Sequence, residues 1–283
     1  MKELKHKVQN AIKILKIAEG EAQLHGQPVE IAYSGGKDSD VLLQLAKESG
    51  IAYRAIYKNT TIDPKGTIKH VRDNNVEVLQ PKMSFFQLIE KKGFPSIFRR
   101  FCCQTLKEYK VLDVCAIGIR TEESVRRKKR YTTFEQCKLY SKKESVRQYF
   151  PIWDWKLSDV KQFVEDRKIQ LAPHYYREDG TIDYTRRLGC QGCPLKSDRG
   201  IADFKAQPKM LKAWLRAGVT YTHTHTLAKF NGNAYDAFYC NVFCTSYEEY
   251  KYRKEKDLFG NVLDCKAYLE ECFDIDLTFK QQS

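Results

Sequence analysis

The chain has 283 residues, of which 42% are hydrophobic and 12% aromatic, so it can bury the core of a large α/β domain, alone or with a smaller appendage. Its net charge of +13 favours polyanionic partners, either nucleic acid or phosphate-rich small molecules. No apolar run approaches the ~18 residues of a membrane helix, and the charged start is unlike an export signal. We therefore expect a cytoplasmic protein with no membrane partner.

The first 120 residues alternate between helical and extended patterns. Apolar residues at helical spacing predict an amphipathic helix over residues 3–22. Strands are predicted at residues 29–33, 51–57, 76–79 and 114–119. Helices are predicted between them, around residues 41–45 and over 64–73, 85–92 and 102–111. This alternation predicts a doubly wound, Rossmann-like α/β fold with a mostly parallel sheet.

Beyond residue 151 the pattern changes. Residues 157–167 predict one more helix, opened by Ser158 or Asp159, and residues 174–200 predict a loop. From residue 201 onward we expect helices, one broken by Pro208 and another over residues 210–217. The expected organisation is thus an α/β domain over residues 1–200 and a smaller, mainly helical region over residues 201–283.

A glycine-rich turn joins the first predicted strand to the apolar helix that follows it. It consists of Ser34, Gly35, Gly36, Lys37, Asp38 and Ser39. A strand, glycine turn and helix present backbone N–H groups and a helix N-terminus to an anion. The glycines admit a phosphate close to the backbone, the lysine supplies a charge, the aspartate can hold magnesium, and the serines can donate hydrogen bonds. The turn is therefore a candidate nucleotide-binding loop.

Polar residues follow two other predicted strands. Asn59, Thr60 and Thr61 come after the second strand, and Gly118, Arg120, Arg126 and Arg127 come after the fourth. Ligands of open α/β sheets bind at the carboxyl ends of the strands, and guanidinium groups match phosphate or sulfate. We therefore add these residues to the nucleotide-binding candidates, with Lys37, Asp38 and Arg120 as candidates for catalysis.

Ten cysteines in a chain without an export signal argue against a disulfide scaffold. They include an adjacent pair, Cys102 and Cys103, and a Cys-x-x-Cys, Cys190 with Cys193. Clustered cysteines in such a chain more often bind metal or carry out redox chemistry. Cys115 lies on a predicted strand and is expected in the core, while Cys240 and Cys244 fit an apolar helix face.

The turn resembles the SGGKDS loop of the adenine-nucleotide alpha-hydrolase superfamily, whose members cleave ATP between its α and β phosphates or act on nucleotides derived from it. Together with residues 100–107 and 189–194, it resembles the phosphoadenosine phosphosulfate (PAPS) reductase family over residues 29–195. The resemblance implies an adenine-nucleotide alpha-hydrolase-like fold and a nucleotide that is ATP, PAPS or adenylyl sulfate, with magnesium. It also implies a 4Fe–4S cluster on Cys102, Cys103, Cys190 and Cys193, with tetrahedral zinc as the alternative.

Two features bear on the reaction. Sulfonucleotide reductases of this family carry a nucleophilic cysteine in a Glu-Cys-Gly-Leu-His tail, whereas this chain has Cys272 in Glu-Glu-Cys-Phe-Asp. Cys272 is the candidate nucleophile, and such a reductase would need a thiol reductant protein such as thioredoxin. By contrast, Lys37 and Asp38 are similar to the loop of members that bind and cleave ATP, such as the small subunit of ATP sulfurylase and the PAPS reductase-like protein of DNA phosphorothioation.

Three hypotheses follow. The first is a PAPS reductase-family enzyme of sulfur metabolism, which reduces a sulfonucleotide or activates a group with ATP while Arg120, Arg126 and Arg127 hold the anion. The second is an ATP pyrophosphatase that adenylates a nucleic acid for sulfur transfer, as in DNA phosphorothioation or tRNA thiolation. The third is a non-catalytic, cluster-bearing nucleic-acid-binding protein.

Overall fold

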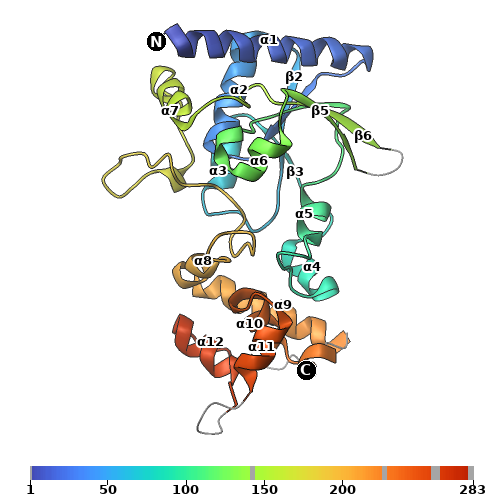
Figure 1. Cartoon of the computed structure of the whole chain (residues 1–283), viewed down its shortest axis with the longest axis vertical. Helices are drawn as coiled ribbons and strands as arrows, with labels where there is room; N and C mark the ends of the chain where they lie inside the picture. Colours follow the sequence, from blue (N-terminus) through green and yellow to red (C-terminus); the bar gives the residue numbers. More distant parts are fainter. Residues whose placement is uncertain (1, 141–143, 225–227, 256–261, 280–283) are drawn as a thin grey trace. The chain divides into compact units, whose positions relative to one another are not determined.

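The computed structural model describes residues 2–140, 144–224, 228–255 and 262–279, and the chain forms two compact units. The sheet unit comprises Met1–Asn59, Asp63–Pro81 and Leu106–Leu188. The helical unit comprises Thr60–Ile62, Lys82–Thr105 and Gly189–Ser283. The chain therefore passes between the units several times, and the helical unit starts before the expected boundary near residue 200 and takes in two earlier segments. Figure 1 shows the chain coloured from its N-terminus to its C-terminus, with most helices and strands labelled.

A six-stranded sheet in the order β3-β2-β1-β4-β6-β5 organises the sheet unit. The strands are β1 (Val29–Tyr33), β2 (Tyr53–Lys58), β3 (Glu77–Leu79), β4 (Val114–Ile117), β5 (Glu135–Leu139) and β6 (Ser145–Tyr149). All neighbouring strands are parallel except β5 and β6. This confirms the predicted mostly parallel α/β sheet. The β5–β6 hairpin was not predicted, because β5 is an edge strand of half-buried and exposed residues without an apolar pattern.

Helices pack around this sheet. They are α1 (Lys2–Leu24), α2 (Lys37–Ser49), α3 (Thr67–Asp73), α6 (Val125–Arg130) and α7 (Leu157–Asp166), with short 3₁₀ turns at Thr121–Glu123 and Pro173–Tyr175. The apolar side of α1 buries Val8, Leu15 and Ala22, and α1 contacts α2, β1, β4 and β6. Because α2 is buried between α1, α7 and β1, its first turn is held firmly at the end of β1.

Several element boundaries differ from the predictions, and those of three helices have local causes or bear on the site. Helix α3 begins at Thr67, three residues beyond Pro64, because Gly66 before it has a left-handed φ of 88°. Helix α5 (Phe101–Leu106) is shorter than the predicted 102–111. The N-cap residue of α7 is Lys156, whereas Ser158 or Asp159 was predicted to begin the helix. The Asp159 carboxylate, in the first turn, accepts a hydrogen bond of 2.6 Å from the Lys156 N–H and so satisfies a backbone donor at the helix start.

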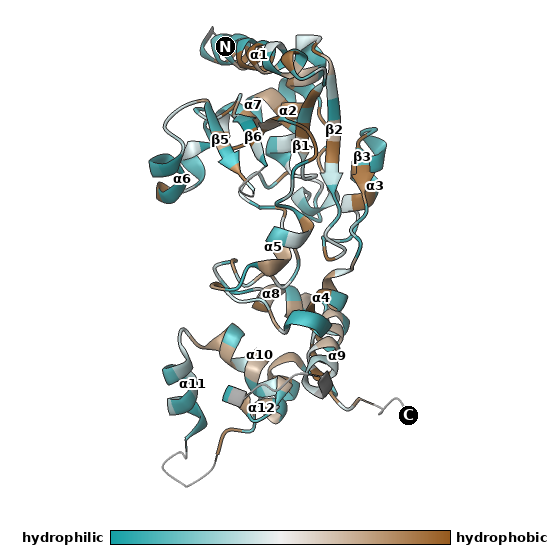
Figure 2. Ribbon diagram, turned by 90° about the vertical axis from the view of Figure 1, so that its right-hand side faces the viewer, coloured by the Kyte–Doolittle hydropathy of each residue, from teal (hydrophilic) through white to brown (hydrophobic). Residues whose placement is uncertain are grey.

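The helical unit is organised around aromatic side chains. Its helices are α4 (Phe85–Lys92), most of α5, α8 (Ile201–Ala206), α9 (Pro208–Thr224), α10 (Ala234–Phe243), α11 (Tyr247–Lys254) and α12 (Cys265–Phe273), with a 3₁₀ turn at Ala228–Phe230. The Trp214 ring lies 4.7 Å from Phe85 and 5.4 Å from Phe204, centroid to centroid. Such edge and tilted pairs add to the energy of apolar burial. Figure 2 shows that α10 is more hydrophobic than α11, which is coloured hydrophilic.

Within the described residues beyond 200, the prediction of a mainly helical region is confirmed. Pro208 separates α8 from α9 as expected, although α9 extends well beyond residues 210–217. Among the described helices, none combines the length and apolar character that a bilayer crossing requires.

Candidate functional site

The Ser34–Ser39 turn lies where the strand order reverses. Strand β1 ends at Tyr33, and its two neighbours in the sheet are β2 and β4. In doubly wound sheets, ligands bind outside the carboxyl ends of the strands at this switch point. The loop after β4 reaches the same place, because a Cβ atom added to Gly118 would lie 2.7 Å from the Asp38 carbonyl oxygen. The two predicted segments are therefore brought together.

Hydrogen bonds within the turn hold its shape. The Ser39 hydroxyl donates to the Gly36 carbonyl at 2.7 Å and accepts from the Ser34 N–H at 3.2 Å. The Ser34 hydroxyl accepts from the Gly36 N–H at 3.3 Å. Gly35 adopts a φ of 76°, which side-chain-bearing residues rarely do. The two hydroxyls thus preorganise the loop, and their role as hydrogen-bond donors to a phosphate remains a prediction.

Two cations converge on one carboxylate in this loop. The Arg120 Nε donates to Asp38 Oδ1 at 2.6 Å, and Lys37 Nζ lies 3.4 Å from Asp38 Oδ2. The Arg120 Nη1 also donates to Glu122 Oε2 at 2.9 Å. The side chains of Lys37 and Arg120 are only 3% and 4% exposed. Burial lowers the pKa of Lys37, and the Asp38 carboxylate opposes that shift. The three residues predicted for catalysis therefore form one buried ionic network.

Tyr175 covers this network, and the sequence did not reveal it. Its hydroxyl accepts a hydrogen bond from the Lys37 N–H at 3.1 Å, and Lys37 Nζ lies 5.5 Å from its ring centroid. Burial raises the pKa of Tyr175 to about 12, so the hydroxyl stays neutral at physiological pH. Lys37 Nζ also donates to the Arg186 carbonyl at 3.3 Å. The only available signal was a run of aromatic residues in a segment predicted to be loop.

A second buried group supports the first turn of α2. The Asp40 carboxylate accepts from the Tyr33 hydroxyl and lies 2.9 Å from His70 Nε2. Burial raises the pKa of Asp40, while contact with His70 opposes the shift. This cluster was also missed, although Asp40 stands two residues after Asp38 in the same helical turn. It ties α2 to β1 and α3 directly beneath the loop.

The four predicted cluster cysteines all belong to the helical unit. Cys102 and Cys103 are on α5, and the pKa of Cys102 is raised first by a hydrogen bond with Cys103, then by burial and by the nearby thiol of Cys190. Cys190 Sγ lies 3.6 Å from Thr60 Oγ1, and Cys193 follows three residues later. At least three of the four thiols thus share one neighbourhood.

The thiol donors suit a 4Fe–4S cluster or zinc. Within the part of the chain that the structure describes, however, no three Cys, His, Asp or Glu side chains are already arranged to hold a metal ion.

Comparison with known sequences identifies the family. Residues 28–196 match the sequence profile of the phosphoadenosine phosphosulfate reductase domain. The chain belongs to this family. The match includes the Ser34–Ser39 loop, Arg120 and all four cysteines discussed above, which confirms the family resemblance drawn from those motifs.

Two uncharacterized proteins of Methanocaldococcus jannaschii are similar to this PAPS reductase-family chain. The first is 31% identical, and the match covers 66% of this chain and 46% of the relative. The second is 26% identical, and the match covers 72% of this chain and 44% of the relative. The chain thus spans less than half the length of these curated relatives.

Among solved structures, the PAPS reductase of Candida auris in complex with phosphate has 13% identity and a TM-score of 0.42, covering 61% of this chain and 89% of its own. FMN adenylyltransferase of Candida glabrata has 16% identity and a TM-score of 0.40, and the match covers 62% of this chain and 60% of that structure.

The candidates after β2 are divided between the two units of this family member. Asn59 ends the first segment of the sheet unit, and its side-chain amide donates to Gln80 at 2.8 Å. Thr60 and Thr61 belong to the helical unit, where the Thr61 hydroxyl accepts from the Phe85 N–H at 2.8 Å and supports the start of α4. Their nucleotide-binding role remains a prediction.

The two arginines predicted beyond β4 differ in their surroundings. Arg127 is half-buried and forms an ion pair with Glu123, and burial lowers its pKa, with Arg187 adding to the effect. Arg187, which the sequence analysis did not single out, donates to the Glu123 carbonyl at 2.7 Å. Arg126 is exposed on α6. Arg127 and Arg187 therefore flank the Lys37–Asp38–Arg120 network, while Arg126 faces solvent.

The remaining cysteine predictions concern one strand and two helices. Cys115 is buried on β4, as expected. Cys240 is buried on α10, and Cys244 is the residue that follows that helix. Cys272 is half-buried near the end of α12 in the helical unit, and its role as a nucleophile remains a prediction.

Proposed function

We propose that this chain is an enzyme that binds ATP with magnesium at the Ser34–Ser39 loop and cleaves it between the α and β phosphates, transferring the adenylyl group to an acceptor. One observation carries the proposal. A family-typical loop lies at the switch point of the sheet, and two buried cations from β1–α2 and β4 converge there on a single carboxylate.

The network suits a triphosphate. Without a ligand, the Asp38 carboxylate is the counter-charge of Lys37 and Arg120. With a nucleotide bound, Lys37 and Arg120 would hold its phosphate oxygens and Asp38 would hold the magnesium ion, whose charge would polarise the phosphates. Lys37 and Arg120 then neutralise charge on the pyrophosphate leaving group. Tyr175, neutral and buried, holds the Lys37 N–H and so fixes the start of α2.

Sulfonucleotide reduction is the competing activity. It would use Cys272 as the nucleophile, release sulfite and require a thiol reductant protein such as thioredoxin. PAPS has no β and γ phosphates, so it would leave the Lys37–Asp38 pair without an evident substrate contact. The presence of this pair in a buried network therefore favours ATP.

We also propose that Cys102, Cys103, Cys190 and Cys193 bind a 4Fe–4S cluster, with zinc as the alternative. Adjacent cysteines are an awkward zinc pair, and the proline after Cys193 also occurs after the last ligand in ferredoxin-type sequences. Anaerobically purified protein should contain iron and sulfide and lose both in Cys193→Ser. The matched control is Cys137→Ser, an exposed thiol of the sheet unit. If the protein contains stoichiometric zinc and no iron, the four cysteines form a zinc site in place of the cluster. If it contains neither iron nor zinc, both proposals are refuted.

The nucleotide proposal is tested by equilibrium binding of Mg–ATP and of PAPS, followed by product analysis. We expect ATP to bind and pyrophosphate to be released on incubation with acceptors, nucleic acids among them. Lys37→Ala and Asp38→Asn should weaken ATP binding at least tenfold, whereas Lys47→Ala, an exposed lysine on the same helix, should not. PAPS binding with sulfite release that needs Cys272 would establish the reductase instead. Absence of binding to either nucleotide would overturn both activities.

A further inference from the structure

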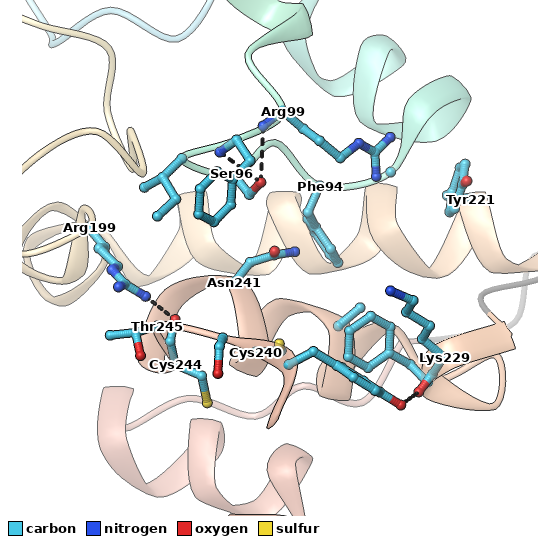
Figure 3. A pocket seen from close by; sticks show the side chains of 17 residues that line it. Phe94, Ser96, Arg99, Arg199, Tyr221, Lys229, Cys240, Asn241, Cys244 and Thr245 are labelled. Atoms are coloured by element: carbon cyan, nitrogen blue, oxygen red, sulfur yellow. Dashed lines mark hydrogen bonds between the residues drawn. The ribbon is translucent and has the colours of Figure 1, made fainter. Parts of the chain in front are cut away.

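The helical unit contains a pocket of about 520 Å³ that is separate from every residue predicted for nucleotide or metal binding. Seventeen residues line it, from the turn after α4, from α10 and the residues that follow it, and from four positions elsewhere in the unit: Arg199, Tyr221, Lys229 and Phe230. Its volume lies within the ~300–1,000 Å³ typical of small-molecule sites. Figure 3 shows Asn241 rising from α10 into the space between the Ser96–Arg99 turn and Lys229.

The pocket is positively charged. Arg99, Arg199 and Lys229 line it, and no aspartate or glutamate does. Within the described residues, none of the three cations forms an ion pair with a carboxylate. Arg99 instead donates to the Lys92 carbonyl at 2.6 Å, and Arg199 to the Cys244 carbonyl. Both guanidinium groups keep further donors, so the pocket is complementary to an anion.

A nearby acid does not cancel this charge. Glu249, in the first turn of α11, accepts hydrogen bonds of 2.6 Å from both the N–H and the hydroxyl of Thr245. The same residue pairs with Arg253, with 2.6 Å between nitrogen and oxygen. Its carboxylate is therefore neutralised by partners outside the three pocket cations.

Aromatic side chains accompany the cations. Phe98, one of the lining residues, is 82% exposed, so its ring is accessible to a ligand. Lys229 Nζ lies 5.3 Å from the centroid of the Tyr247 ring, which in turn lies 5.6 Å from Phe230. Flat rings beside cations suit a ligand that has both a planar ring system and a negative charge.

The other groups in the pocket are neutral. Asn241 offers an amide that can both donate to and accept from the edge of a base. Burial raises the pKa of Cys240 to about 11 and also raises that of Cys244, so both thiols are protonated at physiological pH. These cysteines line the pocket as uncharged surface.

We propose that this pocket binds a nucleotide unit of a single-stranded nucleic acid. The base stacks on Phe98 and Tyr247 with its edge toward Asn241, and the phosphate lies against Lys229, Arg99 and Arg199. A free mononucleotide has the same chemistry and is the other possible source of the ligand. The inference goes beyond ATP cleavage at the Ser34–Ser39 loop and does not depend on it, since all the residues that carry it belong to the helical unit.

The test is fluorescence anisotropy with labelled single-stranded oligo(U) and oligo(dT) of roughly 12 nucleotides, with AMP and inorganic phosphate as competitors and no ATP. We expect Phe98→Ala to weaken oligonucleotide binding by roughly tenfold through lost stacking, and Lys229→Gln by severalfold. The matched controls are Tyr252→Ala, an aromatic residue that is 80% exposed outside the pocket, and Lys209→Gln on α9. Both controls should bind like the unmodified protein.

The outcomes separate the alternatives. Effective competition by AMP would assign the pocket to a free nucleotide, and competition by the oligonucleotide alone would assign it to the polymer. Equal losses in Phe98→Ala and Tyr252→Ala, or competition by phosphate as strong as by AMP, would overturn the proposal. The double variant Lys37→Ala/Asp38→Ala should retain oligonucleotide binding, so a failure at the ATP loop is distinguishable from a failure of the pocket.

Discussion

The two units present positive charge to anions in opposite ways. In the sheet unit, Lys37 and Arg120 are almost fully buried and already paired with Asp38. In the helical unit, Arg99, Arg199 and Lys229 line an open pocket with no carboxylate among its lining residues. A buried, paired network is rigid and demands a ligand of matching shape and charge. Solvent-accessible cations beside aromatic rings tolerate many ligands of one chemical class.

The two arrangements of charge also differ in their effect on folding stability. Burying the Lys37–Asp38–Arg120 network requires desolvation of all three charges, so loss of one member leaves another charge buried and uncompensated. In the pocket, Arg99 and Lys229 are exposed and Arg199 is half-buried, so replacing one of these cations should hardly affect folding. Variants in the two units should therefore separate into those that alter stability and those that alter only binding.

The largest effect is expected for Arg120→Leu. It removes the 2.6 Å hydrogen bond to Asp38 and leaves that carboxylate with Lys37 alone. We expect the free energy of unfolding, measured by urea denaturation, to fall by about 3–5 kcal/mol, and ATP binding to be lost. The control Arg54→Leu breaks an exposed ion pair with Glu77, in which the two side chains are 43% and 42% exposed, and should cost at most about 1 kcal/mol. Equal losses in both variants would contradict a buried, coupled network.

A smaller loss of stability is expected for Gly118→Ala. The new Cβ would lie 2.7 Å from the Asp38 carbonyl oxygen, so the loop after β4 and the start of α2 must move apart. Overpacking of this kind costs about 1–3 kcal/mol. Gly20→Ala on α1 places its Cβ in open space and should instead stabilise the helix by about 0.5–1 kcal/mol. Thermal unfolding of both variants would check the difference in sign, and a Gly118→Ala variant as stable as the unmodified protein would show that the contact is absent.

Salt should distinguish the two anion sites. With three pocket cations, a plot of log affinity for the oligonucleotide against log salt concentration should have a slope near −2. This slope corresponds to a loss of affinity of roughly tenfold to twentyfold between about 50 and 200 mM salt. ATP affinity should change by less than about threefold, because buried charges are screened less. Parallel titrations in potassium chloride would measure both slopes. Equal slopes would mean that the two sites do not differ in exposure as the structure indicates.

The smallest effect concerns alkaline pH. Burial lowers the pKa of Lys37 below the ordinary lysine value of 10.5. Between the folded-state pKa and 10.5 the unfolded chain binds more protons than the folded one, so stability rises with pH in that window. ATP affinity should instead fall as pH rises through the folded-state pKa, by about twofold at that pKa, since phosphate needs the charged ammonium. Lys37→Arg should abolish this decline because a guanidinium stays charged, while Lys47→Arg should leave it unchanged.

Local patterns predicted much of the fold. Strand β1 occupies the predicted residues 29–33, and α4 the predicted residues 85–92, where Ser84 and Gln87 form a reciprocal cap. The weaker predictions lay where tertiary contacts decide. The edge strand β5 has no apolar alternation, and α5 ends at Leu106, earlier than its pattern suggested.

By itself, the sequence determined the alternation of strands and helices, the Ser34–Ser39 turn between β1 and α2, and the family to which they belong. Periodicity, glycine and capping residues act over a few neighbours, so these features are legible without coordinates. Only the tertiary structure decided that Arg120 bonds to Asp38 across 82 positions and that Tyr175 covers Lys37 across 138. It also decided that Phe98, Lys229 and Tyr247 line one pocket. Such pairings depend on strand order and helix packing, which no short stretch of sequence encodes.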